Sequence, residues 1–125
     1  MNKREIGALK ESMAADYLMS QGLKIVARNF RCRIGEIDII AMEYGKSSSY
    51  DNKNTYVFVE VKYRLNKTRG EGYEAVDFRK RNKIIQAARY YAMTKGGLIG
   101  YNIRFDVISI LNDEITWYKN AFRYD

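Results

Sequence analysis

The sequence contains no histidine, and this absence removes several kinds of catalytic site. Serine or cysteine nucleophiles activated by histidine are excluded, as are zinc centres with imidazole ligands. The single cysteine, Cys32, excludes an internal disulfide and a cysteine-rich zinc site, and without a histidine partner it suits a packing or surface role. Neither common glycine-rich phosphate-binding pattern occurs. Carboxylates, lysines and a hard metal ion remain as means of catalysis.

Long apolar runs are also missing. No stretch approaches the roughly 20 residues that a membrane-spanning helix requires. The N-terminus leads directly into a helical pattern, without the apolar core of a signal peptide. We therefore expect a cytoplasmic protein that does not enter a membrane. Its 125 residues, 46% hydrophobic and 14% aromatic, suit one globular domain over residues 1–125.

One segment carries both strand character and charged side chains. Residues 57–62 read Val-Phe-Val-Glu-Val-Lys, and β-branched and aromatic residues favour a β-strand. Because strand side chains alternate between two faces, Glu60 and Lys62 emerge side by side on the face of Phe58. The three valines occupy the opposite face, so a carboxylate and an ammonium neighbour each other on an otherwise apolar strand.

A second segment has the same character. Residues 35–41 read Gly-Glu-Ile-Asp-Ile-Ile-Ala and also predict a strand. Strict alternation puts Glu36, Asp38 and Ile40 on one face, and Ile37, Ile39 and Ala41 on the other. Two such strands, joined as a hairpin through the polar segment 45–54, would bring Asp38 and Glu60 to a common point.

Helical periodicity predicts a first helix over residues 3–21, beginning with a capping box formed by Asn2 and Glu5. Glu11 lies off the apolar stripe, on a face of small residues that another element could approach closely, although a solvated glutamate is the simpler interpretation. The stripe itself, which we expect to face the core, consists of Ile6, Leu9, Met13 and Tyr17.

A second helix is predicted over residues 73–95, ended by Gly96 and Gly97, with strands over 23–30, 101–111 and 115–118. The order is then α-β-β-β-α-β-β, an α/β sandwich with a mixed five-stranded sheet flanked by helices. The expected inner side of the second helix consists of Val76, Ile84, Ile85, Ala88, Tyr91 and Ala92.

The net charge of +7 favours a polyanionic partner. A basic segment with Arg64, Lys67 and Arg69 immediately precedes the second helix, which raises the binding interpretation over that of a merely solvated charged face. The outer side of that helix carries Arg79, Lys80, Arg81, Lys83 and Arg89.

The two acids suit a divalent metal ion. Mg²⁺ takes oxygen ligands, typically one or two carboxylates with water and phosphate, and Asp38, Glu60 and the Val61 carbonyl could supply them. Lys62 could hold an attacking water or stabilise charge on the phosphorus. The competing interpretation is that Glu60 and Lys62 form only a surface ion pair, because Glu-x-Lys is a weak motif alone.

The motifs G-E-I-D-I-I-A at 35–41, V-F-V-E-V-K-Y-R at 57–64 and R-F-D-V at 104–107 resemble those of the bacterial YraN-like family. That family is similar to Holliday-junction resolvases and to other PD-(D/E)xK, restriction-endonuclease-like nucleases. The resemblance implies a three-layer sandwich whose site is Asp38, Glu60 and Lys62, with Glu11 reaching in from the first helix as an accessory acid. It also implies that Lys80, Lys83 and Gln86 face nucleic acid or the rim of the site.

Together these features lead us to expect a Mg²⁺- or Mn²⁺-dependent endonuclease that acts on DNA rather than RNA, with branched DNA as a candidate substrate. Phosphates would be held by Arg64, Lys67, Arg69, Lys80 and Lys83. A non-catalytic nucleic-acid-binding module on the same scaffold is the first alternative, and a protein-interaction adaptor is the second. The oligomeric state stays open, with a homodimer as one option because junction resolvases act as dimers.

Overall fold

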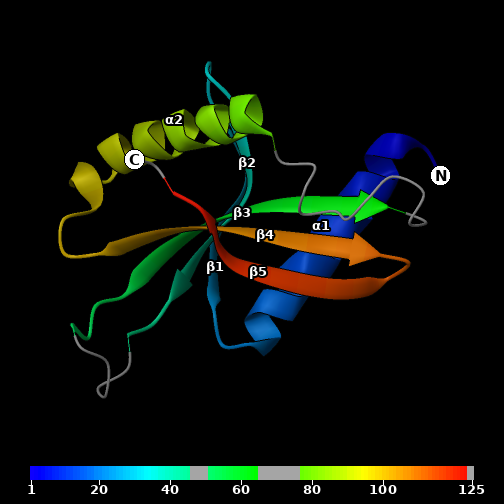
Figure 1. The fold of residues 1–125 in the computed structure, drawn as a ribbon, viewed down its shortest axis with the longest axis horizontal. Helices are drawn as coiled ribbons and strands as arrows, with labels where there is room; N and C mark the ends of the chain where they lie inside the picture. Colours follow the sequence, from blue (N-terminus) through cyan, green and yellow to red (C-terminus); the bar gives the residue numbers. More distant parts are fainter. Residues whose placement is uncertain (46–50, 65–76, 124–125) are drawn as a thin grey trace.

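The computed structural model describes residues 1–45, 51–64 and 77–123, which form two α-helices and a five-stranded sheet (Figure 1). The predicted element order is confirmed. The first three strands follow one helix, and a second helix separates them from the last two. The elements are α1 (Lys3–Ser20), β1 (Lys24–Arg31), β2 (Glu36–Glu43), β3 (Thr55–Arg64), α2 (Phe78–Thr94), the 3₁₀ turn η2 (Gly96–Leu98), β4 (Asn102–Leu111) and β5 (Glu114–Phe122).

The sheet is mixed, as predicted, with the strands in the order β1-β2-β3-β4-β5. The first three strands pair antiparallel, β3 pairs parallel with β4, and β4 pairs antiparallel with β5. A parallel pair needs a long crossover between its strands, and α2 lies within the crossover from β3 to β4. This connection from β3 to β4 starts where β3 ends, at Arg64.

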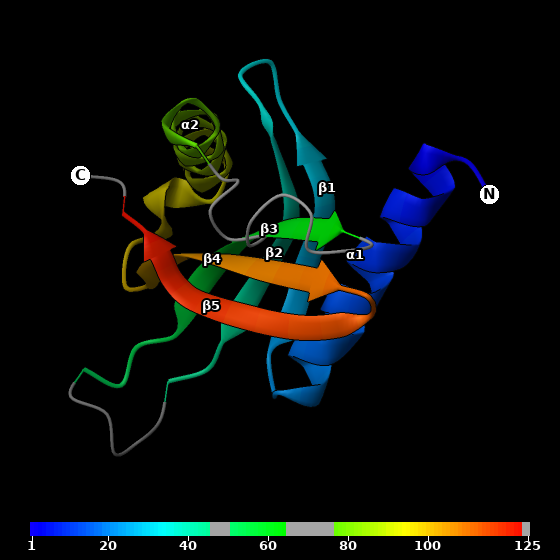
Figure 2. The same ribbon diagram turned by 45° about the vertical axis from the view of Figure 1, so that its right-hand side comes forward.

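Helix α1 packs on one face of the sheet through small side chains (Figure 2). Ala14 and Leu18 are fully buried against β2, β3 and β4, whereas Leu9 is 50% exposed. The predicted inner stripe is therefore wrong at Leu9, and Met13 and Tyr17 pack only beside the buried cluster. Small residues let the helix approach the sheet closely, and this close approach outweighs the larger apolar area of the stripe.

Helix α2 packs on the opposite face, and its predicted inner side is confirmed for Ile84, Ile85, Ala88 and Tyr91. Ala92 is partly buried, and Val76 lies outside the described residues. The aromatic rings beneath the helix are stacked or edge-to-face, which adds to their burial energy. These rings belong to Phe58, Phe105, Phe122 and Tyr91.

A buried carboxylate fastens β5 to β4. Asp106 is fully buried and accepts hydrogen bonds from the Arg104 guanidinium, the Trp117 indole N–H and the Asn120 backbone N–H, each at 2.9 Å. Arg104 also donates to Glu43 at 2.7 Å. The β4–β5 register shifts between Phe105 and Val107, and Asn120 has a φ of 54°. The carboxylate thus satisfies groups that the irregular ladder leaves unpaired.

The β1–β2 hairpin has a similar irregularity, which overturns the predicted alternation of β2. Ile37 and Ile39 were predicted to share one face, but Ile39 belongs to the cluster under α1 and Ile37 belongs to the cluster under α2. Asn29, between the register pairs Arg28–Ile39 and Phe30–Ile37, has a φ of 52°. A residue in this left-handed conformation breaks the pleat, so the hairpin twists between the two isoleucines.

Candidate metal centre and basic cleft

The candidate site lies where β2 and β3 separate. Their ladder ends at the pair Ile39–Val59; beyond it β2 continues beside β1, while β3 continues beside β4. We call this point the β2–β3 fork. In Figure 2 the β1–β2 hairpin turns away from β3 toward α2. Asp38 and Glu60 are the first residues beyond the last pair, so the end of the ladder puts both acids at the fork.

Asp38 spans the fork. Its Oδ2 accepts a hydrogen bond from the Val61 backbone N–H at 2.8 Å, which ties the β2 side chain to β3. Burial, and then the charge of Glu60, raise the pKa of Asp38 to about 7, although the Val61 N–H opposes this shift. Asp38 and Glu60 thus lie within electrostatic reach of each other at the fork.

The Val61 carbonyl faces the same space. A strand residue directs its N–H and C=O to the same side, and the Val61 N–H points to Asp38. The carbonyl oxygen therefore also points to the β2 side, where β2 has already left the ladder. Two carboxylates and one backbone oxygen thus surround the fork, and all three are hard oxygen donors that suit Mg²⁺ or Mn²⁺.

Within residues 1–45, 51–64 and 77–123, no group of three or more acidic or cysteine side chains gathers as a ready set of metal ligands. A metal ion at the fork would therefore have only two carboxylates and the Val61 carbonyl as protein ligands from this part of the chain, and water and phosphate would have to supply the others. That donor count fits Mg²⁺, which usually keeps several waters and binds one or two carboxylates.

Glu60 has an ion-pair partner that differs from the predicted one. Its side chain is 7% exposed, and its Oε1 lies 3.0 Å from the Nζ of Lys80, in the first turn of α2. The competing interpretation paired Glu60 with Lys62, which lies within electrostatic reach of it, whereas Lys80 was expected to face nucleic acid or the rim of the site. Burial disfavours the Lys80 ammonium, but Glu60, Asp38 and Glu36 together raise its pKa above the usual value.

Lys62 lies near both groups. Burial lowers its pKa, and the neighbouring Lys80 lowers it further, while Glu60 acts in the opposite direction. A lysine with a depressed pKa holds its proton less firmly, which suits proton transfer to or from water. Lys62 thus lies within electrostatic reach of both Glu60 and Lys80.

Glu11 approaches from α1, as the resemblance implied. Burial raises its pKa, and the charge of Asp38 raises it further, against Arg28 and a hydrogen bond from Asn29. The approach is possible because α1 presents small residues to the sheet, among them the buried Ala14 and Ala15. Glu11 therefore lies within electrostatic reach of Asp38, on the rim of the fork.

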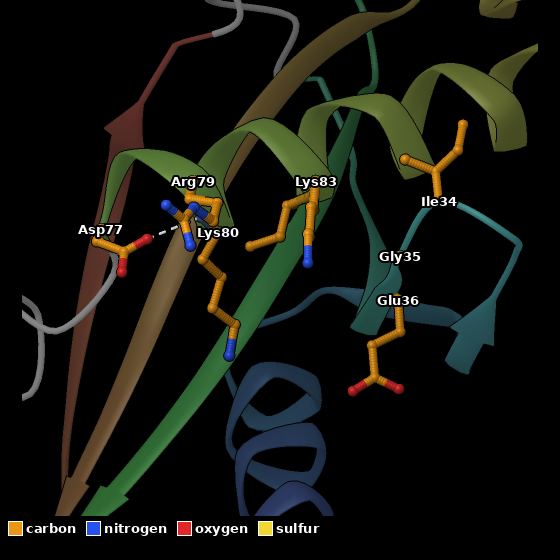
Figure 3. A pocket seen from close by; sticks show the side chains of 8 residues that line it. Ile34, Gly35, Glu36, Asp77, Arg79, Lys80 and Lys83 are labelled. Carbon is orange, nitrogen blue, oxygen red and sulfur yellow. Dashed lines mark hydrogen bonds between the residues drawn. The ribbon is translucent and has the colours of Figure 1, made fainter.

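A cleft of about 380 Å³ adjoins these residues, between the β1–β2 turn and the first turns of α2 (Figure 3). In Figure 3 Lys80 and Lys83 extend from α2 into the cleft, with Glu36 on the facing wall. Asp77 caps the helix by accepting from the Lys80 N–H at 2.8 Å, which fixes the first turn. The lining residues are Ile34, Gly35, Glu36, Asp77, Arg79, Lys80, Lys83 and Ile84.

Gly35 sets the width of this cleft. A β-carbon at Gly35 would lie 3.2 Å from the backbone oxygen of Lys83, so glycine allows the β1–β2 turn to press against α2. Of the predicted phosphate-binding residues, Lys80 and Lys83 line the cleft and Arg64 ends β3. Lys67 and Arg69 lie outside the described residues.

Sequence reasoning missed part of this wall. Gln86 was predicted at the rim and lines an adjoining hollow, but Ile34, Phe78 and Asn82 line that hollow too and were not predicted. The signal available in the sequence was weak. An aromatic residue directly after the N-cap Asp77 resembles any other apolar helix residue, and its exposure becomes known only from the packing of α2.

No helix in the described part of the chain is both long enough and apolar enough to span a membrane. A model of the family described as "Uncharacterised protein family UPF0102" matches residues 10–110. A UPF0102 protein of Lachnoclostridium phytofermentans is 45% identical over 122 residues, covering 98% of this chain and 96% of the relative. UPF0102 proteins of Fusobacterium nucleatum and Clostridium botulinum are 43% and 41% identical over 120 and 126 residues, each covering 96% of this chain and 92% and 95% of the relatives. The chain therefore belongs to the UPF0102 family, which confirms the YraN-like resemblance.

Proposed function

We propose that this protein is a metal-dependent endonuclease that hydrolyses phosphodiester bonds in DNA, with branched DNA as the candidate substrate. The observation that carries the proposal is the position of Asp38 and Glu60 as the first residues beyond the β2–β3 ladder. A mixed sheet between two helices, with acids where its central strands separate, supports a restriction-endonuclease-like sandwich and a link to PD-(D/E)xK nucleases.

Asp38, Glu60 and the Val61 carbonyl would hold one Mg²⁺ or Mn²⁺ ion. When bound, such an ion supplies charge stabilisation at the phosphate and lowers the pKa of a coordinated water. The hydrogen bond from the Val61 N–H orients the Asp38 carboxylate before any ion binds. The repulsion that raises the pKa of Asp38 is the kind of interaction that a cation between two carboxylates relieves.

The lysines have separate roles in this proposal. Lys62, with its lowered pKa, orients the attacking water and exchanges a proton with it. Lys80 neutralises Glu60 in the free protein and moves to a phosphate oxygen when substrate enters the cleft, since 47% of its side chain is exposed and it is free to change rotamer. Glu11, coupled to Asp38, acts as an accessory acid on the rim.

The test is nicking of branched, single-stranded and duplex DNA in Mg²⁺ or Mn²⁺, with EDTA as the blank. We expect Asp38→Asn and Glu60→Gln, which preserve shape, to lose at least about a hundredfold of the wild-type rate, because removal of one electrostatic contribution to a transition state commonly costs that much. Lys62→Ala should retain binding and lose the chemical step.

Asp16→Asn is the matched control, because Asp16 is an exposed acid on α1, more than one helical turn beyond Glu11. Circular dichroism establishes that each variant is folded. Equal nicking by wild type, Asp38→Asn and Glu60→Gln would mean that a contaminant cleaves the DNA, and the proposed catalysis would be wrong.

A second candidate function is a nucleic-acid-binding module without catalysis. The Lys80–Glu60 ion pair favours it, because an ammonium 3.0 Å from the carboxylate occupies one of the two expected metal ligands. This alternative predicts salt-sensitive binding that is indifferent to Mg²⁺. A calorimetric titration in which wild type binds Mg²⁺ and Asp38→Asn does not would contradict it.

A further inference from the structure

A second hollow, of about 400 Å³, continues from the basic cleft along α2. It shares Ile34, Arg79 and Lys83 with the cleft, so the two hollows adjoin each other along α2. Its remaining lining residues are Phe78, Asn82 and Gln86. We call it the α2 hollow.

Two apolar side chains flank the α2 hollow from different elements. Phe78, the first residue of α2, is 79% exposed, and Ile34 in the β1–β2 turn is 48% exposed. Single exposed apolar residues are common on protein surfaces. Here, however, two of them face one hollow across the contact that Gly35 makes with Lys83, so the pair is positioned by packing.

The polar residues of the hollow suit a nucleobase. Phe78, Asn82 and Gln86 are four residues apart and therefore lie on one stripe of the helix. Asn and Gln amides each offer a donor and an acceptor, the combination that pairs with the edge of a base. Arg79 and Lys83 directly follow Phe78 and Asn82 in the sequence and place two cations beside this stripe. The phosphates on either side of a bound base would lie next to these cations.

We propose that the α2 hollow receives an unstacked nucleobase from a single strand or a branch point. Phe78 and Ile34 cover the faces of the base, and Asn82 and Gln86 contact its edge. A continuous duplex cannot supply this group, because its bases are stacked and their edges are paired. The inference rests on the proposed function only in assuming that nucleic acid occupies the neighbouring cleft, and it names the substrate as DNA with unpaired bases.

The experiment measures equilibrium binding by fluorescence anisotropy in EDTA, so that neither a metal ion nor cleavage is required. Three labelled DNAs of matched composition are compared: a single strand, a branched molecule with unpaired bases at its junction, and a fully paired duplex. For Phe78→Ala we expect affinity for the first two to fall about five- to hundredfold, the range for loss of one base–aromatic stack, and affinity for the duplex to change by less than about twofold.

Two variants make this result specific. Met93→Ala removes an apolar side chain that is 75% exposed in the last turn of the same helix, and it should bind all three DNAs like wild type. Phe78→Trp retains an aromatic plane and should keep or improve single-strand binding. In the proposed arrangement Phe78 contacts a base and no phosphate. Its removal should therefore leave the salt dependence of the remaining binding unchanged.

Unchanged affinity of Phe78→Ala for the single strand and the branched DNA would overturn the inference, as would an equal loss on all three DNAs. Failure of the wild-type protein to bind any DNA would overturn it together with the nucleic-acid part of the proposed function. A selective loss in Phe78→Ala, in a wild-type protein that cleaves nothing, would support the inference and reject the endonuclease.

Discussion

Asp38 is the residue on which both the structure and the proposed chemistry depend. Its carboxylate joins β2 to β3 through the Val61 N–H, at the point where the two strands cease to pair. Burial and the charge of Glu60 make its ionised form unfavourable, so the folded protein retains a proton on Asp38 to about pH 7. The Asp38 side chain thus links two strands by a hydrogen bond, in surroundings that disfavour its negative charge.

This conflict predicts how stability depends on pH. The pKa of Asp38 rises on folding from 3.8 to about 7, so over that interval the folded state binds more protons than the unfolded state. Stability should therefore fall as pH rises through this window in the absence of metal. Asp38→Asn stays neutral and still accepts from the Val61 N–H, so its free energy of unfolding should fall less between pH 5 and pH 8.

Urea unfolding in EDTA at several pH values measures both curves. The expected result is that Asp38→Asn gains stability relative to wild type as pH increases. Parallel curves for the two proteins would show that Asp38 does not titrate in this range, and that the fork is more hydrated than its burial indicates.

At the residue scale, the sequence was sufficient to select the two candidate acids, but it did not predict which lysine pairs with Glu60. Alternation within β3 put Glu60 on the face of Phe58, and in the structure Glu60 contacts Lys80 of α2, the helix that packs over Phe58. The Lys80 partner comes from a different element, 20 positions further along the chain, and its contact depends on how α2 lies over the sheet. Local periodicity contains no information about that packing.

At the scale of elements, α1 shows how a correct helix can be given the wrong inner face. Its extent and its capping box were predicted almost to the residue. Its apolar stripe was not the buried one, because close approach of the helix axis favours alanines over larger side chains at the contact. The small-residue face also carries Glu11, so the packing of α1 and the approach of this acid have one cause.

Substitutions on α1 test this assignment. Ala14→Leu inserts a larger side chain at a fully buried position and should destabilise the protein by about 1–3 kcal/mol, the usual cost of overpacking. Leu9→Ala removes a half-exposed side chain and should cost less than about 1 kcal/mol. Denaturant midpoints of the two variants measure both effects. The reverse ranking would restore Leu9 to the core and contradict the orientation of α1.

Strand β2 shows a different kind of failure. Strict alternation predicted that Ile37 and Ile39 would share a face, and the twist at Asn29 on the partner strand separates them. The residue pattern of one strand contains no information about an irregularity in the neighbouring strand. Strand β4, by contrast, alternates regularly here, with Phe105 and Val107 on one face and Ile108 on the other.

At the scale of the whole molecule, several of the basic side chains gather at one place on the surface. Within the described residues, Arg79, Lys80 and Lys83 line one cleft beside the fork. The net charge of +7 indicated a polyanion without locating it, because location depends on the β1–β2 turn meeting α2. If this cleft holds phosphates, each cation in it contributes to the salt dependence of binding.

Lys83→Ala should therefore weaken DNA binding about equally for single-stranded and duplex DNA, and reduce the slope of log affinity against log salt by about one. Lys24→Ala is the matched control, since Lys24 is an exposed lysine at the opposite end of β1 and should leave the slope unchanged. Anisotropy titrations at four salt concentrations give the slopes. Identical slopes for Lys83→Ala and wild type would place the phosphates elsewhere on the surface.

Both outermost strands of the sheet are irregular: β1 shifts register between Ile25 and Ala27, and the β4–β5 pair shifts between Phe105 and Val107. A strand from a second copy would meet an irregular edge strand on either side of the sheet. Irregular edge strands discourage edge-to-edge pairing of sheets. Pairing of two copies through the sheet margins is thus disfavoured.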